Sequence, residues 1–579
     1  MAARNYRGKK SSSRKTPNNT MDGAERDEKF QRDNSQAASS AKRSGRNKAA
    51  KNSAGDAASS SSRNSNHYGW YVPNQDIVND VSSTFFSYRT GDQMPVACTD
   101  YQVDAAPTNF QSFSFRSGDY AMPGVIALDF MPTYGNLTAP SSAGNVAATA
   151  VYSWIRHANS GARNYDRTDL MLYLLAMDSI YCGITVCQRI ISTVMMYNRW
   201  NSYTPDVLLR AMGVGKQENI AGDLAQMRYR LNSMILKAST LAVPATMPIY
   251  ERHAYMCSNV YVDEPNATAQ FYLFKPQYLY KFGYDANNAG CLTLIEMLTN
   301  SGAPSTTWQD IFTIVEGCID ALYGDEDAGI MSGDILKAYG EGGLMKLATV
   351  TTDTVLVPIY DHDLLIQMHN ATLHGGVFRT TAEGTDNFGI YQVIPDSNTV
   401  GPYLENRFTF QCAIGPQTPS RASHIILDLH TEPTVESVMR STRLMNHLVY
   451  KSGGSATVRP LIDWDLSELG SDVAFRATVF WYNSGTTDPM GITTGYVNNT
   501  FIPPASMSDA TMTALWRMLT FTLAPRLLVA PTASTSAASS LIPFAQLDRV
   551  TALSFDELDR INRVALLGLF NIPRLTLQG

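Results

Sequence analysis

The side chains that build most protein cores, Val, Ile and Leu, are absent from the first 71 residues, and the first of them is Val72. Ordering a residue costs roughly 1–2 kcal/mol of backbone entropy, and this segment has almost no apolar area whose burial could offset that cost. Residues 1–70 are therefore predicted to form a disordered arm. A secretory signal needs an apolar stretch after its first charges, so none is expected here, and we expect synthesis in the cytosol.

The same segment is strongly basic, with 15 Lys and Arg against 6 Asp and Glu, a net charge of +9 (15 − 6). The other 508 residues hold 31 basic and 46 acidic side chains, a net charge of −15 (31 − 46), so the chain totals −6. A solvated cationic chain releases counterions when it lies on phosphates, which predicts RNA or DNA binding that reads no bases and weakens with salt. Aromatic residues for base stacking do not alternate with the charges. The predicted contact residues form two clusters: Arg4, Arg7, Lys9, Lys10, Arg14 and Lys15, then Lys42, Arg43, Arg46, Lys48 and Lys51.

Three other roles for the arm stay open at this stage. It could keep the protein soluble, carry a localisation signal, or clamp the acidic body of a neighbouring molecule. The clustering of its charges favours nucleic acid.

Cysteine is scarce, scattered and odd in number, with seven residues and no Cys-x-x-Cys pair. This usage predicts reduced, mostly buried thiols rather than disulfides or a zinc site. The seven are Cys98, Cys182, Cys187, Cys257, Cys291, Cys318 and Cys412.

Motifs for nucleotide and acyl chemistry are missing or incomplete. The Gly213–Lys216 stretch resembles the end of a phosphate-binding loop, but Gln217 follows where a hydroxyl should bind Mg²⁺, and Arg210 stands where the leading Gly belongs. No Gly-x-Ser-x-Gly nucleophile motif occurs.

The densest histidine cluster also lacks the spacing of a metal site. Its histidines lie seven and five residues apart rather than three or four, so surface or core histidines are favoured over ligands. The cluster consists of Asp361, His362, Asp363, His369 and His374.

Two short motifs resemble motifs of nucleic-acid polymerases. The run Tyr323–Asp327, with Asp325 and Asp327, resembles a metal-binding aspartate turn, and Ser452–Thr457 resembles a nucleotide-selecting motif. Their order along the chain is the reverse of the usual one, and the first lacks adjacent Asp residues after its Gly. With no set of residues filling the roles of an active site, we predict no enzyme, no catalytic residue, no cofactor and no metal ion.

The densest apolar segment runs from Leu170 to Met196 and is interrupted by Asp178 and Arg189. A membrane span needs about 20 unbroken apolar residues, so this segment predicts a long buried helix instead, and no membrane span. Asp178 and Arg189 lie about three helical turns apart, and each is expected to pair with another helix.

Periodicity and capping signals place further elements and predict an α+β, predominantly α-helical chain whose middle contains strands. Ser554 and Glu557 form a capping box, flanked by a Leu553–Leu558 staple, that opens a C-terminal helix through Phe570. The other expected helices are 204–213, one that starts at 220 and is ended by Pro244, 308–323, 334–339 and 435–450. The expected strands are 269–274, 408–414, 424–429 and 473–482.

Three stretches, Pro123–Pro132, Val151–Gly161 and Asn164–Tyr181, resemble the capsid protein of picobirnaviruses. The resemblance implies an icosahedral virion shell of two-fold dimers around a double-stranded RNA genome. Each subunit would have a largely helical shell domain and a protruding dimerisation domain. On this basis we expect an arm at 1–70, a shell domain at 71–250 plus 505–579, and a protruding domain at 251–504. The expected partners are further copies of the chain and RNA.

Polar residues lie just ahead of the long apolar helix: Arg156, His157, Asn159, Asn164, Tyr165 and Asp166. We favour a structural role, in which Asn and Asp side chains cap the helix and Arg156 pairs with a carboxylate such as Asp169. The functional alternative is a subunit contact or an RNA-facing loop.

The main alternative to a shell is a scaffold that coats RNA without closing. An enzyme is the third hypothesis. Self-cleavage of the arm near Ser65–Tyr71 is also open, although no nucleophile is recognisable.

Overall fold

The computed structural model describes residues 93–96, 101–102, 114–115, 118–121, 124–159, 161, 165–196, 203–216, 220–264, 269–297, 306–375, 377–378, 388–395, 401–410, 424–450, 464–466, 469–483, 491–502, 509–529 and 542–571. All of them belong to the unit Tyr88–Gly579. The predicted disorder of residues 1–70 and the eleven basic residues assigned to RNA lie outside this set.

A five-stranded sheet, in the order β18-β17-β5-β7-β6, runs through the core. Its middle strand β5 (Val125–Pro132) is buried at all eight positions, as a strand covered on both faces should be. It pairs antiparallel with β17 (Asp472–Tyr482) and parallel with β7 (Phe271–Pro276). The outer strands are β18 (Ile492–Val497) and β6 (Tyr261–Val262).

An acid in the middle strand fixes this pairing. Asp129 of β5 is fully buried, and its carboxylate accepts from Arg476 Nε of β17 at 2.7 Å and lies 2.9 Å from Lys275 Nζ of β7. Both cations occupy the positions directly opposite Asp129 in the ladders. A shift of either neighbour by one residue would turn its cation to the other face and leave a buried charge unpaired.

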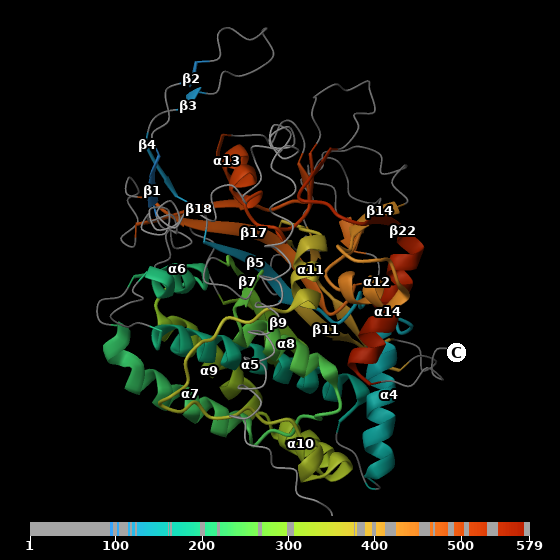
Figure 1. The fold of residues 1–579 in the computed structure, drawn as a ribbon. Helices are drawn as coiled ribbons and strands as arrows, with labels where there is room; N and C mark the ends of the chain where they lie inside the picture. The colour runs from blue at the N-terminus through green and yellow to red at the C-terminus, as the bar shows by residue number, and fades with distance from the viewer. Residues whose placement is uncertain are drawn as a thin grey trace, which may run out of the picture. The chain divides into compact units, whose positions relative to one another are not determined.

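Helix α5 (Arg167–Val194) is buried along almost its whole length. It packs against α4, α7, α8, α9 and β8, and Figure 1 shows it enclosed by helices on the side of the sheet where α7–α9 lie. Among the described residues it is the one helix long and apolar enough to cross a membrane, and its apolar window is 100% buried inside the protein. The prediction of a long buried helix is confirmed.

The other helices are α4 (Ala143–Ala158), α6 (Tyr203–Ala211), α7 (Leu224–Ala238), α8 (Pro248–Ser258), α9 (Trp308–Tyr323), α10 (Glu326–Tyr339), α11 (His362–Asn370), α12 (Val435–Ser441), α13 (Asp509–Met518) and α14 (Phe555–Leu569). Smaller sheets are β12-β11-β9-β8 (Tyr403–Asn406, Gly389–Val393, Gly290–Glu296, Tyr278–Tyr284), β10-β13-β16-β15 (Val377–Phe378, Thr409–Phe410, Trp464–Leu466, Leu448–Tyr450) and β19-β20-β21 (Phe501–Ile502, Leu527–Val529, Ile542–Phe544). Two-stranded pairs are β14-β22 (His424–Asp428, Val550–Ser554), β1-β4 (Gln93–Val96, Gly118–Ala121) and β2-β3 (Tyr101–Gln102, Ser114–Phe115). The chain is α+β, as predicted.

The predicted helix over 435–450 is wrong in its second half. Helix α12 ends at Ser441, and Leu448–Tyr450 forms strand β15. Leu444 is buried in the main core and its neighbour Met445 in a separate small cluster. After α12 the chain turns through residues 442–444, with the Met445 N–H bonded to the Thr442 carbonyl, and this turn places the two side chains in different clusters instead of continuing the helix.

The predicted domain boundaries cross the central sheet. Strand β5 lies in the segment assigned to a shell domain, whereas β7 and β17 lie in the segment assigned to a protruding domain. The division concerns an assembled particle and stays a prediction.

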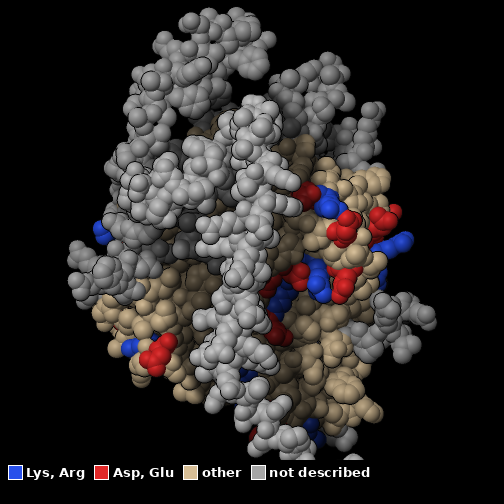
Figure 2. Space-filling model, in the orientation of Figure 1, with Lys and Arg blue, Asp and Glu red and all other residues tan. Residues whose placement is uncertain are grey.

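Charged side chains are unevenly distributed over the described surface. Figure 2 shows both signs gathered on the side where α12, α14 and β22 lie, while much of the rest of that face is uncharged. The charges there include exposed pairs of opposite sign, Arg440 with Glu436 and Arg549 with Glu432. No surplus of positive charge for RNA is visible among the described residues of this face.

The close packing of α5 on α9 yields a test. A Cβ atom added at Gly183 of α5 would lie 2.8 Å from Val315 Cγ2 of α9 and 3.2 Å from Leu279 Cδ1. We expect Gly183→Ala to lower the free energy of unfolding by about 1–3 kcal/mol through overpacking, as measured by chemical denaturation. Gly317→Ala on α9 is the control: its Cβ would meet nothing closer than Lys281 Nζ at 4.0 Å, so it should be neutral or stabilising by up to about 1 kcal/mol. Equal effects of the two changes would contradict this packing.

Candidate functional site

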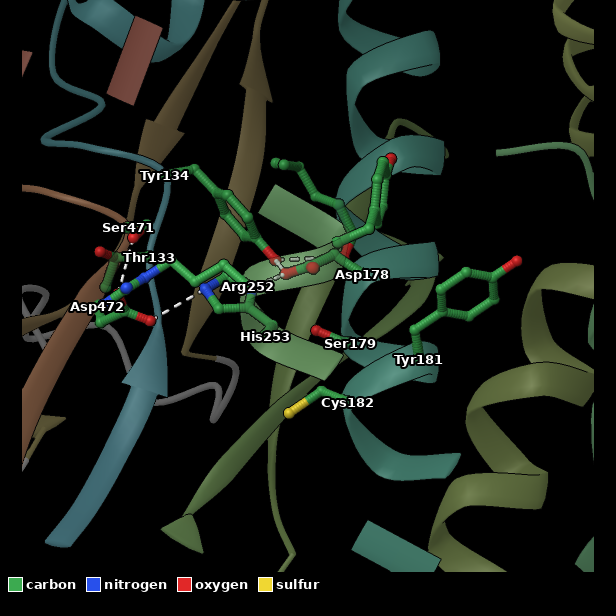
Figure 3. A network of polar contacts seen from close by, with 12 residues as sticks. Thr133, Tyr134, Asp178, Ser179, Tyr181, Cys182, Arg252, His253, Ser471 and Asp472 are labelled. Carbon is green, nitrogen blue, oxygen red and sulfur yellow. Dashed lines mark hydrogen bonds and ion pairs between the residues drawn. The ribbon is translucent and has the colours of Figure 1, made fainter. Parts of the chain in front are cut away.

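A buried network of charges joins the helices to the central sheet (Figure 3). His253 of α8 is wholly buried between two carboxylates: its Nδ1 lies 2.6 Å from Asp178 Oδ2 of α5, and its Nε2 lies 2.9 Å from Asp472 Oδ1 of β17. An ionised carboxylate only accepts hydrogen bonds, so both ring nitrogens must donate. His253 is therefore an imidazolium ion.

Both carboxylates have further donors. The Tyr134 hydroxyl donates to Asp178 Oδ2 at 2.9 Å. Ser471 Oγ and Arg252 Nε donate to Asp472 Oδ2 at 2.7 and 2.9 Å. The network is thus two acids and two cations with their hydrogen bonds largely satisfied, the condition under which buried charge is tolerated.

These contacts shift the protonation of the network. Burial alone would lower the pKa of His253, but the charges and hydrogen bonds of Asp178 and Asp472 outweigh it and raise the pKa to about 10. Burial opposes ionisation of Asp472, yet Arg252 and His253 hold its pKa well below the ordinary value. The charged state therefore persists through neutral pH.

This arrangement cannot perform nucleophilic catalysis. A general base needs a free ring nitrogen beside a nucleophile, and both nitrogens of His253 already donate to carboxylates. The hydroxyl of Ser471 donates to Asp472 rather than to the ring. The network holds α5, α8 and β17 together.

A second cluster of ionisable groups lies between α11 and β14. His369 Nε2 is 3.1 Å and His430 Nε2 is 3.4 Å from the same oxygen, Oδ2 of Asp428. One ligand atom from each of the three residues lies within 4.8 Å of the others. His369 and Asp428 are fully buried, and the backbone N–H of Asp548 also donates to Asp428 Oδ2, at 2.9 Å.

Electrostatics differ among these three residues. Burial opposes ionisation of Asp428, but hydrogen bonds from His369 and Asp548 and the neighbouring histidines lower its pKa overall. Burial and the adjacent His369 lower the pKa of His430. A cluster of this composition could hold a metal ion.

Sequence reasoning missed this cluster because it grouped His369 with the wrong neighbours. His369 meets Asp428 and His430 through tertiary packing, whereas His374 is buried elsewhere with its pKa lowered to about 4 by burial. His362 lies near the Tyr360 hydroxyl. The available signal was Asp428-Leu429-His430, two ionisable residues on one face at the end of a predicted strand.

Two of the motifs rejected for enzymes are structural. Gly213, at φ +87°, ends α6 with the Val214 N–H bonded to the Leu209 carbonyl, so the stretch closes a helix instead of opening one on a phosphate. Asp325 caps α10 by accepting from the Ala328 N–H at 2.8 Å. Ser452–Thr457 lies outside the described chain.

The polar residues ahead of α5 are also structural where they are described. Arg156 does pair with a carboxylate, but with Asp334 of α10 at 3.5 Å rather than with Asp169. Tyr165 donates to Asp334 at 2.6 Å, and Asn159 donates to its backbone carbonyl at 2.9 Å. Asp169 instead accepts a hydrogen bond from the backbone N–H of Asp166, which is the N-cap residue of α5. His157 is exposed, and Asn164 is not among the described residues.

The two charged residues inside α5 reach other elements as expected. Asp178 binds His253 of α8. Arg189 donates to carbonyl oxygens of Met256 and Asn259 at the end of α8 and of Phe274 in β7, the partial negative charge of a helix C-terminus replacing a carboxylate.

Comparisons with known proteins agree on one family. The family model described as "Picobirnavirus, Capsid protein" matches residues 70–554. A "Capsid protein precursor" of Human picobirnavirus (strain Human/Thailand/Hy005102/-) is 31% identical over 517 residues, 88% of this chain and 91% of that protein. An X-ray crystallographic structure of the picobirnavirus capsid has a TM-score of 0.73 at 22% identity, covering 89% of this chain and 99% of the other, which supports the fold.

The imidazolium of His253 predicts a pH dependence. Unfolded His loses its proton near pH 6.5, whereas folded His253 keeps it to about pH 10, so this stabilisation is complete below pH 6.5 and is lost as pH rises to 10. We expect His253→Gln to lower the free energy of unfolding by about 3–5 kcal/mol at pH 6 and to flatten its decline between pH 6.5 and 10.

Denaturant titrations at several pH values measure both effects, and His374→Gln is the control. The pKa of His374 is lowered, so its contribution is lost on the acid side and the alkaline slope should stay that of the unmodified protein. Parallel alkaline slopes for His253→Gln and the unmodified protein would show that His253 is not charged.

Proposed function

This chain belongs to the picobirnavirus capsid protein family, and we propose that it assembles as dimers into an icosahedral shell that encloses a double-stranded RNA genome. The observation that carries the proposal is the place where the family match begins. It starts at residue 70, where the basic segment ends and the acidic body begins. A structural role in the virion, rather than catalysis, follows from the family.

We infer that residues 1–70 contact RNA through their Lys and Arg without sequence preference. Packed RNA must be partly neutralised, and the net charge of +9 in this segment suits that task, whereas the body carries −15. The buried cations Lys275 and His253 and the half-buried Arg476 are already paired with acids. The basic arm holds 15 of the 46 Lys and Arg of the chain within 71 residues.

Self-association is supported by large apolar side chains on the described surface. Trp154 of α4 is 58% exposed, Trp516 of α13 60% and Tyr229 of α7 78%. Aromatic side chains are favoured anchors in protein interfaces, and covering them stabilises an assembly. Dimer formation through residues 251–504 and synthesis in the host cytoplasm remain part of the same proposal.

Cleavage of the arm near Ser65–Tyr71 is a separate question. The human relative is named a precursor. In this chain the charged networks of the described residues hold no nucleophile beside a free base. A constant intact mass of the purified protein over days would exclude self-cleavage.

The alternative is a scaffold that coats RNA without closing, and truncation separates the two. We expect closed particles by electron microscopy from both the full-length protein and a form lacking residues 1–66, with the ratio of absorbance at 260 to 280 nm falling to that of protein alone in the truncated form. Neutralising Lys42, Arg43 and Arg46 to Gln should lower the RNA content and the salt dependence of RNA binding. Neutralising Arg26, Lys29 and Arg32, which lie among acidic residues, removes the same charge and should have a smaller effect.

The outcomes are distinct. Particles without the arm that retain the same RNA content would refute the role of the arm. Assembly only in the presence of RNA would favour the scaffold.

A further inference from the structure

We propose that His369, Asp428 and His430 bind one divalent transition-metal ion of the kind that takes imidazole and carboxylate ligands, such as Zn²⁺. The inference departs from the expectation of no metal site and does not depend on shell assembly, because all three ligands come from one chain.

The orientation of His369 is the first support. Its Nδ1 lies 2.8 Å from the Ala524 carbonyl oxygen, which only accepts, so Nδ1 carries a proton and Nε2 faces Asp428. A neutral ring would then point its lone pair at a carboxylate oxygen, which requires a proton or a cation between them. A ring N–H held by a backbone carbonyl is also the usual outer contact of a metal-binding histidine.

The distances fit a common ion. Zn²⁺ binds His nitrogen and carboxylate oxygen at about 2.0–2.2 Å, which in a tetrahedron separates neighbouring ligand atoms by about 3.3–3.5 Å. The Nε2 atoms of His369 and His430 lie 3.1 and 3.4 Å from Asp428 Oδ2. Small side-chain movements would therefore complete the site.

Two buried atoms of the cluster lack hydrogen bonds. Asp428 Oδ1 and His430 Nε2 have no hydrogen-bond partner. The carboxylate oxygen carries lone pairs that a cation would use, and the ring nitrogen carries one when the proton is on Nδ1. His430 is held at φ +53°, a conformation that non-glycine residues rarely adopt, by its N–H bond to the Asp548 carbonyl. Strain of this kind is retained where the side chain must be aimed at a particular place.

A buried positive charge lies beside the same cluster. Arg526 opposes the ion: it is buried, its own pKa is lowered to about 10 by that burial, and the charge of Asp428 acts on it. Its Nε and Nη1 atoms make no hydrogen bond.

Isothermal titration of the purified full-length chain with Zn²⁺, after treatment with a chelator, tests the proposal. We expect one ion per chain, a rise in melting temperature on adding Zn²⁺, and weaker binding at acid pH. His430→Gln should weaken the affinity at least tenfold, because it removes the most exposed ligand without opening the core. His362→Gln, on the same helix as His369 but outside the cluster, should leave the affinity unchanged.

Arg526→Met supplies a test in the opposite direction. Removing a positive charge beside the site should tighten Zn²⁺ binding, an effect that a site elsewhere on the surface would not show. Circular dichroism checks that each variant is folded. No stoichiometric binding by the unmodified chain, or equal binding by it and His430→Gln, would overturn the proposal and assign His369 to a simple ion pair with Asp428.

Discussion

Two carboxylates, those of Asp178 and Asp472, lie in the core, and a buried acid is stable there only when cations and hydrogen-bond donors surround it. The imidazolium of His253 meets both, so one ring joins the long helix α5, helix α8 and the central strand β17. In the central sheet, Asp129 of β5 is paired in the same way with Lys275 of β7 and Arg476 of β17. Apolar packing alone tolerates small slips, whereas these pairs fix which residues face each other.

The buried charges described above are paired within the chain itself, and this determines which charged and apolar groups are available for contact with partners. Among the described residues, the buried acids have cationic or hydrogen-bonding partners, and most of the other acidic side chains are at least partly exposed. A negatively charged surface repels phosphates, which is consistent with our proposal that RNA contacts the basic segment. In the same proposal, contacts between subunits use the exposed apolar side chains of the described surface.

Local signals predicted local structure well. The bounds of α9 match the prediction, and the capping box of Ser554 opens α14 as expected. Prediction failed where distant segments compete, as at Leu444 and Met445, which serve different cores. Both clusters of ionisable groups depend on contacts between segments that are distant in the sequence. Asp428 and His430, for example, contact His369 only when β14 packs against α11. The spacing of these three residues in the sequence does not indicate that they are in contact, although their residue types suit a metal site.

The position of β5 has a consequence for synthesis on the ribosome. This strand ends at Pro132, but its antiparallel neighbour β17 is complete only at Tyr482, 350 residues later (482 − 132). At about 5–20 residues per second, one edge of this fully buried strand stays without its partner for roughly 20–70 s. An unpaired apolar edge is a template for the wrong chain, and many copies made side by side raise that risk. The helices translated in this interval, α4 to α12, are the elements that could cover the unpaired edge of β5.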